Sequence, residues 1–261
     1  MTSWNRVEGT KQCLESLFEH TFGDYNIYIT DNGSTDGTVE YLKSLSGYPI
    51  EMTFLRENIG IASARNAHWY KCAGNDVVRM DNDIVIKTDD WFEILRDIAY
   101  RHHAFVGIIP DSYLPLIPDI TRDLIFTDEL PQHEKYLYSV AGNLMFIPKA
   151  ASDIIGHWCE DYGLYAFEDT DYALRGEVIG YGQIFTTLVK HDHLYPEMGA
   201  DKRLGLEICN HYWDIVKQNL INFGRMLANQ SKEEGGLEKT EPGFSRFNDH
   251  KAIACSAAGI R

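Results

Sequence analysis

Two carboxylates separated by one residue, Asp81 and Asp83, directly follow a short apolar run that is typical of a buried strand. In open α/β sheets, ligands bind in the crevice at the carboxyl ends of the strands. Acids in that position can hold a hard divalent cation, which in turn can hold the phosphates of a nucleotide. The alternative is a solvated turn rich in Asp and Asn. Spacing alone leaves both interpretations open.

A third acid, Asp31, ends another predicted strand, over residues 26–30, so we expect it at the same sheet edge as Asp81. A carboxylate there can accept a hydrogen bond from a nucleobase N–H or a ribose hydroxyl. It can equally cap a turn by accepting from the amides of Ser34 and Thr35. Both roles remain open at this stage.

Arg65 lies on a predicted helix that begins near Asn58 and is otherwise rich in alanine. Such a helix can pack close to a sheet and hold an arginine rigidly, and a guanidinium suits a diphosphate or the face of a base. A surface arginine paired with Glu57 is the alternative.

Three acids in four residues, Glu168, Asp169 and Asp171, stand at the start of a predicted helix over residues 168–179. Helix amino termini favour negative charge, which offers a structural explanation. Three acids nevertheless exceed what a helix terminus needs. An Asp169 side chain that points into a cleft could accept a proton from an attacking hydroxyl.

His191 and His193 follow a predicted strand over residues 183–189, and their alternation places both imidazoles on one side. They are either ordinary surface or core histidines or metal ligands. Mixed carboxylate and imidazole ligation would suit manganese as well as magnesium.

Strands and helices are expected to alternate over the first hundred residues, and these elements must position the residues named above. We expect helices near 8–20, 39–45, 58–67 and 89–100, and strands at 26–30, 51–55 and up to Asp81. This alternation predicts an α/β fold with a mostly parallel central sheet flanked by helices and joined by right-handed crossovers.

The second half of the chain is less regular. We expect a polar turn without a strand at residues 1–6, and a loop or small hairpin over 111–134. Further elements are a strand over 136–147, helices at 149–155 and 204–227, and a polar stretch from 229.

Composition narrows the class of protein. The chain has 261 residues and a formal net charge of -15, which disfavours nucleic acid as a general partner. Its five cysteines are odd in number and scattered without a C-x-x-C pair, which argues for a reducing compartment. The sequence shows neither a signal peptide nor an apolar run of the roughly 20 residues that span a bilayer. We therefore expect a cytoplasmic protein.

Taken in order, eight segments over residues 1–195 resemble glycosyltransferase family two, whose members are inverting enzymes with the GT-A fold. The segments are Thr2-Ser3-Trp4-Asn5-Arg6, Asp31-Asn32-Gly33-Ser34-Thr35-Asp36-Gly37-Thr38, Asn58-Ile59-Gly60 continuing to Ala64-Arg65-Asn66, Met80-Asp81-Asn82-Asp83, Ala141-Gly142-Asn143-Leu144-Met145, Glu168-Asp169-Thr170-Asp171 with Leu174-Arg175, Gly180-Tyr181, and Val189-Lys190-His191.

The resemblance implies a role for each matching residue. Asp169 is expected as the catalytic base. Asp83, Asp81 and His191 are expected at a Mn²⁺ or Mg²⁺ ion, with Asp81 and Asp83 as the DXD motif. Asp31 would contact the base, and Arg65 would lie on the nucleotide side. The remaining expected nucleotide- or substrate-binding residues are Thr2, Trp4, Asn5, Arg6, Asn32, Asn82, Gly142, Glu168 and Arg175.

The resemblance also implies the domain organisation. Residues 1–200 would form a single GT-A domain, with a nucleotide-binding half over 1–103 and an acceptor and catalytic half over 104–200. A C-terminal helix over 201–228 and a polar tail over 229–261 would follow.

Two features depart from the family pattern. Asn32 stands where a second acid usually follows Asp31. The apolar strand that usually precedes the segment beginning at Thr2 is represented here by Met1 alone. Either that strand is missing from the sequence, or the protein builds its sheet without it and leaves neighbouring strand edges unpaired.

The implied function is metal-dependent, inverting transfer of a sugar from a nucleotide-diphosphate sugar, a uridine nucleotide by family frequency, to an acceptor hydroxyl. The acceptor would be a glycan, a lipid carrier or a protein. A nucleotidyltransferase is one competitor, although it would normally carry a glycine-rich basic loop near its amino terminus. A non-catalytic nucleotide- or sugar-binding module is the other.

Overall fold

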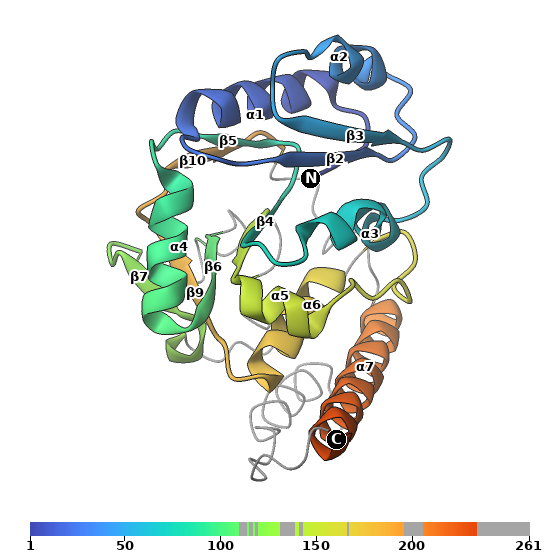
Figure 1. Cartoon of the computed structure of the whole chain (residues 1–261), viewed down its shortest axis with the longest axis vertical. Helices are drawn as coiled ribbons and strands as arrows, with labels where there is room; N and C mark the ends of the chain where they lie inside the picture. Colours follow the sequence, from blue (N-terminus) through green and yellow to red (C-terminus); the bar gives the residue numbers. More distant parts are fainter. Residues whose placement is uncertain are drawn as a thin grey trace.

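The computed structural model describes residues 1–109, 114, 117, 120–130, 139–140, 143–165, 167–195 and 206–233 (Figure 1). Its elements are, in order, β1 (Thr2–Ser3), α1 (Val7–His20), β2 (Ile27–Asp31), α2 (Thr38–Ser44), β3 (Ile50–Phe54), α3 (Ile61–Cys72), β4 (Val77–Met80), β5 (Ile84–Ile86), α4 (Trp91–His102), β6 (Ala104–Ile108), β7 (Leu124–Phe126), the 3-10 helix η2 (Thr127–Glu129), β8 (Leu144–Ile147), α5 (Lys149–Ile155), α6 (Glu168–Val178), β9 (Gly182–Thr186), β10 (His191–His193) and α7 (Leu206–Glu233).

Strands β1–β4 and β6–β9 form an α/β sheet in two parts, and β5 and β10 form a separate two-stranded sheet. In the first part the order is β1-β2-β3, and all three strands are parallel. In the second part the order is β4-β8-β6-β9-β7, in which β8 and β7 run opposite to their neighbours and β6 pairs in parallel with β9. A parallel bridge between Thr2 and Asp81 joins the two parts. The predicted α/β class is confirmed, but the sheet is mixed rather than mostly parallel, because β8 and β7 pair antiparallel with their neighbours.

Helices cover the sheet on both faces. One apolar cluster joins Leu14 of α1 and Leu95 of α4 to β6 and β8, and a second joins Trp69 of α3 and Tyr172 of α6 to the other face of those strands. Every residue of β6 and β8 is buried, as expected for strands covered by helices on both sides. Figure 1 shows α1 and α2 on one side of β2 and β3, with α3 on the other.

The opening residues differ from the prediction. We expected a polar turn, but Thr2 and Ser3 form β1 and pair in parallel with Thr30 and Asp31. Strands on both sides supply partners for these two residues: the Asn32 amide donates to the Ser3 carbonyl at 2.7 Å, and Thr2 bridges to Asp81. A cavity of about 260 Å³ adjoins Met1 between β2 and β4.

The segment around the two histidines also differs. We expected a strand over residues 183–189, whereas β9 ends at Thr186 and a separate strand, β10, carries both histidines. It pairs antiparallel with β5, which follows Asp83 directly. Ile84, Val85 and Ile86 are β-branched and suit a strand, so the chain continues straight from the acids into this small sheet.

Other predictions fall partly outside the described residues. These include most of the expected loop over 111–134, the first part of the expected strand over 136–147, Gly142, and the tail beyond residue 233. Within the described part, a long C-terminal helix is present as α7, and no helix is long and apolar enough to cross a membrane.

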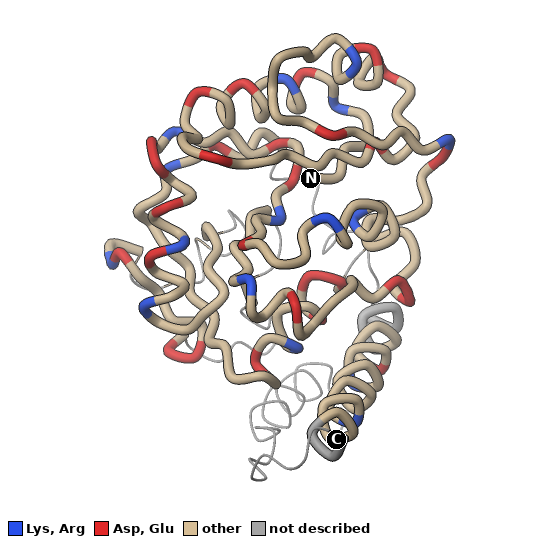
Figure 2. Tube along the Cα trace, viewed as in Figure 1, with Lys and Arg blue, Asp and Glu red and all other residues tan. Residues whose placement is uncertain are grey.

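Acidic and basic positions are spread over many elements rather than collected in one basic stripe (Figure 2).

Candidate active site

The turn Asp81-Asn82-Asp83 lies at the carboxyl end of β4 and is held by its middle residue. The side-chain amide of Asn82 donates to the Thr10 hydroxyl at 2.8 Å and to the Asn5 carbonyl at 3.3 Å. Asn82 therefore joins this turn to the start of α1 by hydrogen bonds within the protein. The two flanking carboxylates are left to make other contacts.

Asp83 is nearly enclosed and lies between two cationic or potentially cationic groups. Its Oδ2 accepts a hydrogen bond from Arg6 Nη1 at 2.6 Å, and its side chain is 4% exposed. Its Oδ1 lies 3.7 Å from His193 Nε2 and accepts no hydrogen bond within the part of the chain that the structure describes. A buried carboxylate oxygen without a donor is what a cation ligand requires.

His193, rather than His191, lies against Asp83. The register of the small sheet pairs His193 with Ile84, the residue after Asp83, and pairs His191 with Ile86. The Leu194 amide also donates to the Asp83 carbonyl at 3.0 Å, which fixes this register at the site. The family motif pointed to His191, but the antiparallel pairing decides which imidazole is nearer to the acid.

These groups fit a divalent metal. The described residues contain no set of three or more His, Cys, Asp and Glu side chains already gathered as a metal site. Asp83 Oδ1 and the His193 ring nevertheless offer one oxygen and one nitrogen, and Asp81 lies across the same turn. Oxygen ligands with one imidazole suit Mn²⁺, and also Mg²⁺ when phosphate oxygens complete the coordination.

Arg79 is a site residue that was not singled out in the sequence. Its Nη2 lies 2.9 Å from Asp81 Oδ1 and 3.0 Å from Asp169 Oδ2, and its side chain is 5% exposed. Burial opposes the charged form, but Asp169 and Asp81 together raise the pKa of Arg79 above its ordinary value. The available signal was a charged residue inside an otherwise apolar strand, which is rarely buried without a partner.

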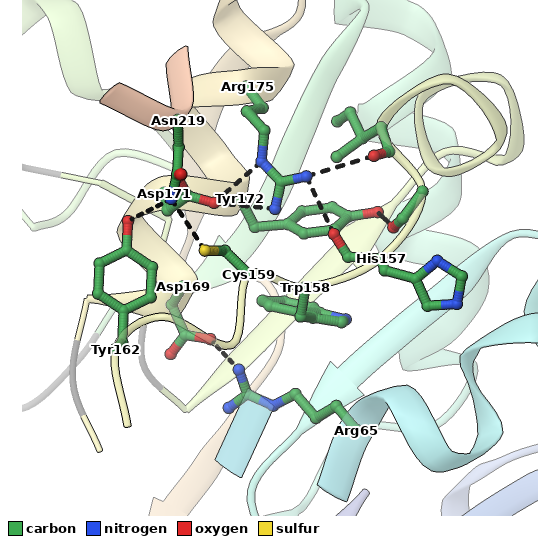
Figure 3. Close-up of polar contacts among 12 residues, drawn as sticks. Arg65, His157, Trp158, Cys159, Tyr162, Asp169, Asp171, Tyr172, Arg175 and Asn219 are labelled. Carbon is green, nitrogen blue, oxygen red and sulfur yellow. Dashed lines mark hydrogen bonds and ion pairs between the residues drawn. The ribbon is translucent and has the colours of Figure 1, made fainter. Parts of the chain in front are cut away.

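Asp169 and Glu168 meet Arg65 at the start of α6, and Figure 3 shows the contact between Arg65 and Asp169. Arg65 Nη1 lies 2.6 Å from Asp169 Oδ1 and 3.1 Å from Glu168 Oε1, and its guanidinium stacks 4.6 Å from the Trp158 ring centroid. The expectation of a rigidly held arginine is met, with the acid pair rather than Glu57 as its partner. Asp169 thus contacts a different arginine with each oxygen.

Glu168 is buried beside Asp169, and these two effects raise its pKa to about 7, against the opposing influence of Arg65 and Arg79. Because the folded pKa exceeds the unfolded one, the folded protein binds more protons between about pH 4.5 and 7. We expect the free energy of unfolding to fall as pH rises through this window, by about 1–3 kcal/mol from this group.

In the Glu168→Gln variant this fall should be largely absent, as measured by urea unfolding between pH 5.5 and 8. Glu160→Gln is the control. Hydrogen bonds from Asn66 and Ser63 lower the pKa of Glu160, so its contribution to stability changes only below about pH 4.5, and this variant should keep the fall. An unchanged slope in Glu168→Gln would contradict the assignment.

Asp171 and Arg175 belong to the protein interior. Arg175 Nε donates to Asp171 Oδ2 at 2.9 Å, and its Nη1 donates to the His157 carbonyl at 3.0 Å (Figure 3). Asn219 of α7 donates to Asp171 Oδ1 at 3.3 Å. Arg175, expected at the substrate, therefore ties α6 to the loop that carries Trp158, and its partner Asp171 ties α6 to α7. Two residues advance a helix by about 200°, which separates Asp171 from Asp169.

The turn after β2 is closed on itself. Asp31 is fully buried and accepts hydrogen bonds from the Ser34 amide at 2.9 Å and the Ser34 hydroxyl at 2.6 Å. Asn32 accepts from the Ile59 amide at 3.0 Å and donates to the Asn58 side chain at 2.9 Å. In this structure Asp31 caps the turn by accepting hydrogen bonds from Ser34, and Asn32 connects the turn to the residues just before α3 by hydrogen bonds.

The loop between β1 and α1 connects these parts. The side-chain Oδ1 of Asn5 accepts a hydrogen bond from the backbone amide of Thr35 at 2.8 Å. The backbone amide of Asn5 donates to the Ser34 hydroxyl at 2.7 Å. Trp4 is 53% exposed at this edge. The structure therefore brings the predicted residues of β1, its loop, the turn after β2 and the acidic turn to one edge of the sheet.

The fold and site together define a class. The mixed α/β sheet, with helices on both faces, matches solved glycosyltransferases of the GT-A fold. The mannosyltransferase PcManGT of Pyrobaculum calidifontis, solved with GDP-Man and Mn²⁺, superposes with a TM-score of 0.60 at 17% identity, over 99% of this chain and 72% of that one. TarS of S. aureus (residues 1–349), solved with UDP, gives 0.58 at 14% identity, over 98% and 79%.

Sequence comparison gives the family. The family described as Glycosyl transferase family 2 matches residues 1–151, and the chain belongs to it. It is 24% identical over 235 residues to the hyaluronan synthase of Pasteurella multocida, covering 85% of this chain and 23% of that protein. It is 31% identical over 99 residues to glycosyltransferase GlyA of Streptococcus pneumoniae, covering 38% and 14%. The chain thus spans a quarter or less of the length of these curated relatives.

Proposed function

We propose that this chain transfers a sugar from a nucleotide-diphosphate sugar to an acceptor hydroxyl, with inversion and with a divalent metal. The observation that carries the proposal is the linked set of Asp81, Arg79 and Asp169, with Asp83 two residues after Asp81 in the same turn. Arg79 contacts both Asp81 and Asp169, so the acids after β4 and the acid on α6 face one another across a single guanidinium. Solved neighbours of the same fold contain GDP-Man with Mn²⁺ or UDP-GlcNAc, which supports the donor class.

Asp83, with His193 beside it, would hold the metal, and Asp81 would complete the acidic turn. The metal would supply charge neutralisation at the departing nucleoside diphosphate. Arg65 and Arg79 bring two further positive charges to the same edge, held in place by carboxylates and by the face of Trp158. Guanidinium groups suit phosphate oxygens, so these arginines would orient the leaving group.

Asp169 would take the proton from the acceptor hydroxyl. Both of its oxygens contact arginines in this structure, at 2.6 Å and 3.0 Å. A carboxylate held in this way is positioned accurately, and it can accept a proton once one arginine turns toward the donor phosphates. Direct attack by the activated hydroxyl, without a covalent sugar–protein intermediate, gives inversion.

The nucleobase of the donor and the class of acceptor complete the proposal. A uridine nucleotide is proposed from the family resemblance, with Trp4 as an exposed aromatic surface at the nucleotide edge. Residues 1–103 would form the nucleotide-binding half and residues 104–200 the acceptor half. The acceptor is proposed to be a hydroxyl of a glycan, a lipid carrier or a protein.

A thermal-shift screen of nucleotides and nucleotide sugars, with Mn²⁺ or Mg²⁺, tests the proposal. A ligand at 100 times its Kd adds about 2.7 kcal/mol to the free energy of unfolding, enough to raise Tm by several degrees. We expect the largest shifts from nucleoside diphosphates and their sugars, and only with metal. A preference for nucleoside triphosphates, with pyrophosphate release, would instead favour a nucleotidyltransferase.

A further inference from the structure

Arg6 shares the Asp83 carboxylate with the proposed metal site: it binds Oδ2, whereas Oδ1 is the oxygen offered to the metal. Its Nη1 donates to Asp83 Oδ2 at 2.6 Å, and the Arg6 side chain is 32% exposed whereas that of Asp83 is 4% exposed. The guanidinium reaches from the solvent side to an enclosed acid. A divalent cation at the same carboxylate would meet this positive charge at close range, so the two cations oppose each other.

The backbone around Arg6 is fixed, so any movement must come from the side chain. Asn5 and Arg6 both have positive φ angles, of 56° and 63°. The Arg6 carbonyl accepts from the Thr10 amide at 2.9 Å, and Asn5 is tied to the turn after β2. The long Arg6 side chain extends from this anchored loop and can exchange one anionic partner for another.

A second partner for the guanidinium is already in place. The Arg6 Cζ atom lies 5.0 Å from the centroid of the Tyr195 ring, within the range of a cation–π contact. Tyr195 packs against α1 at Gly9, where an added Cβ would lie 2.8 Å from the ring. The absence of a side chain at Gly9 thus makes room for the Tyr195 ring. This ring can keep the Arg6 guanidinium near the site after the guanidinium leaves Asp83.

We propose that Arg6 is a displaceable counter-ion of Asp83 that couples metal binding to nucleotide binding. This inference rests on the proposed metal site at Asp83. Without a nucleotide, a metal at Asp83 Oδ1 is opposed by the Arg6 guanidinium at Oδ2 of the same carboxylate, and binding is weak. A diphosphate offers the released guanidinium a new anionic partner, so the metal and the nucleoside diphosphate strengthen each other's binding, by the same factor in both directions.

The test is calorimetric titration of Mn²⁺ alone into the full chain and into Arg6→Gln. Removal of one hydrogen-bonded charge that competes for the site should tighten Mn²⁺ binding about 10- to 100-fold. Lys87→Gln is the matched control, because Lys87 pairs with Asp192 beside the same small sheet but does not bind Asp83. It removes an equal charge and should change Mn²⁺ affinity by less than about threefold.

The same Mn²⁺ titrations, repeated in the presence of saturating UDP, measure how strongly the nucleotide affects metal binding in each protein. In the unaltered protein, UDP should greatly strengthen Mn²⁺ binding, whereas in Arg6→Gln this gain should shrink by about the factor by which Mn²⁺ alone was tightened. Arg6→Lys keeps a cation and should resemble the unaltered protein more than Arg6→Gln does. Circular dichroism and Tm should remain near those of the unaltered protein, because the backbone contacts of residue 6 persist.

Three outcomes overturn the inference. If the unaltered chain binds Mn²⁺ with UDP but Arg6→Gln binds Mn²⁺ alone no more tightly, Arg6 does not compete with metal, and the proposed function stands. If neither protein binds Mn²⁺ under any condition, the metal-dependent function fails together with the inference. Equal tightening in Lys87→Gln would likewise show a general charge effect and overturn it.

Discussion

Asp169→Asn should reduce sugar transfer by about 100- to 10,000-fold, the usual effect of losing a positioned base. Asparagine keeps the size of the side chain but cannot accept a proton at neutral pH. Its Oδ1 can still accept the hydrogen bond from Arg65, while its amide group would face Arg79. We therefore expect near-parental affinity for a nucleotide sugar with metal, measured by calorimetry, beside a much lower rate in a transfer assay.

Asp171→Asn is the matched control, on the same helix and with a more deeply buried carboxylate. Asp171 pairs with Arg175 and accepts from Asn219, contacts that join α6 to α7. Weakening that buried pair should lower the free energy of unfolding by about 1–3 kcal/mol, while the transfer rate per folded molecule stays near the parental value. If Asp169→Asn transferred sugar at the parental rate, the base would have to be sought elsewhere, first at Glu168.

Asp83→Asn should lower Mn²⁺ affinity by more than about 100-fold, because even residues that only support metal ligands change affinity by about 10- to 100-fold. The charge that binds the cation is lost, while the backbone contact between the Asp83 carbonyl and the Leu194 amide remains. The variant should fold normally, and nucleotide affinity with Mn²⁺ should fall to its metal-free level. Calorimetry with Mn²⁺ and UDP measures both quantities.

Asp192→Asn provides the control for this prediction, since Asp192 lies on the neighbouring strand β10, half exposed and paired with Lys87. It should leave Mn²⁺ affinity nearly unchanged. Replacing the two histidines separates their roles: His193→Ala should weaken Mn²⁺ binding more than His191→Ala, because His193 is the ring that lies 3.7 Å from Asp83. Parental Mn²⁺ affinity in Asp83→Asn would remove Asp83 as the metal ligand.

The sequence by itself determined the order of the main elements. Helices α1 and α4 and strands β2 and β4 follow from apolar periodicity and from turns that local chemistry specifies, such as the Asp and Ser residues after β2. Acids at the ends of β2 and β4 could be placed at one edge because parallel strands share an orientation. These features depend on neighbours in the chain, which a sequence displays directly.

The tertiary structure decided which of those polar residues meet. Arg79 joins Asp81 to Asp169 across 90 or so positions, and Arg6 reaches Asp83 from the other end of the domain's first half. Neither pair has a spacing signal: Arg6 meets Asp83 because β1 lies beside the end of β4, and Arg79 meets Asp169 because the start of α6 lies against β4.

Register and burial decided the remaining roles. His193 faces Asp83 because β10 pairs with β5 in one register, and a shift of one residue would turn both histidines to the other face. Arg175 and Asp171 face α7 rather than the site because helix rotation separates them from Asp169. Local sequence could name the acids, arginines and histidines, but long-range pairing determined which of them a metal or a nucleotide can reach.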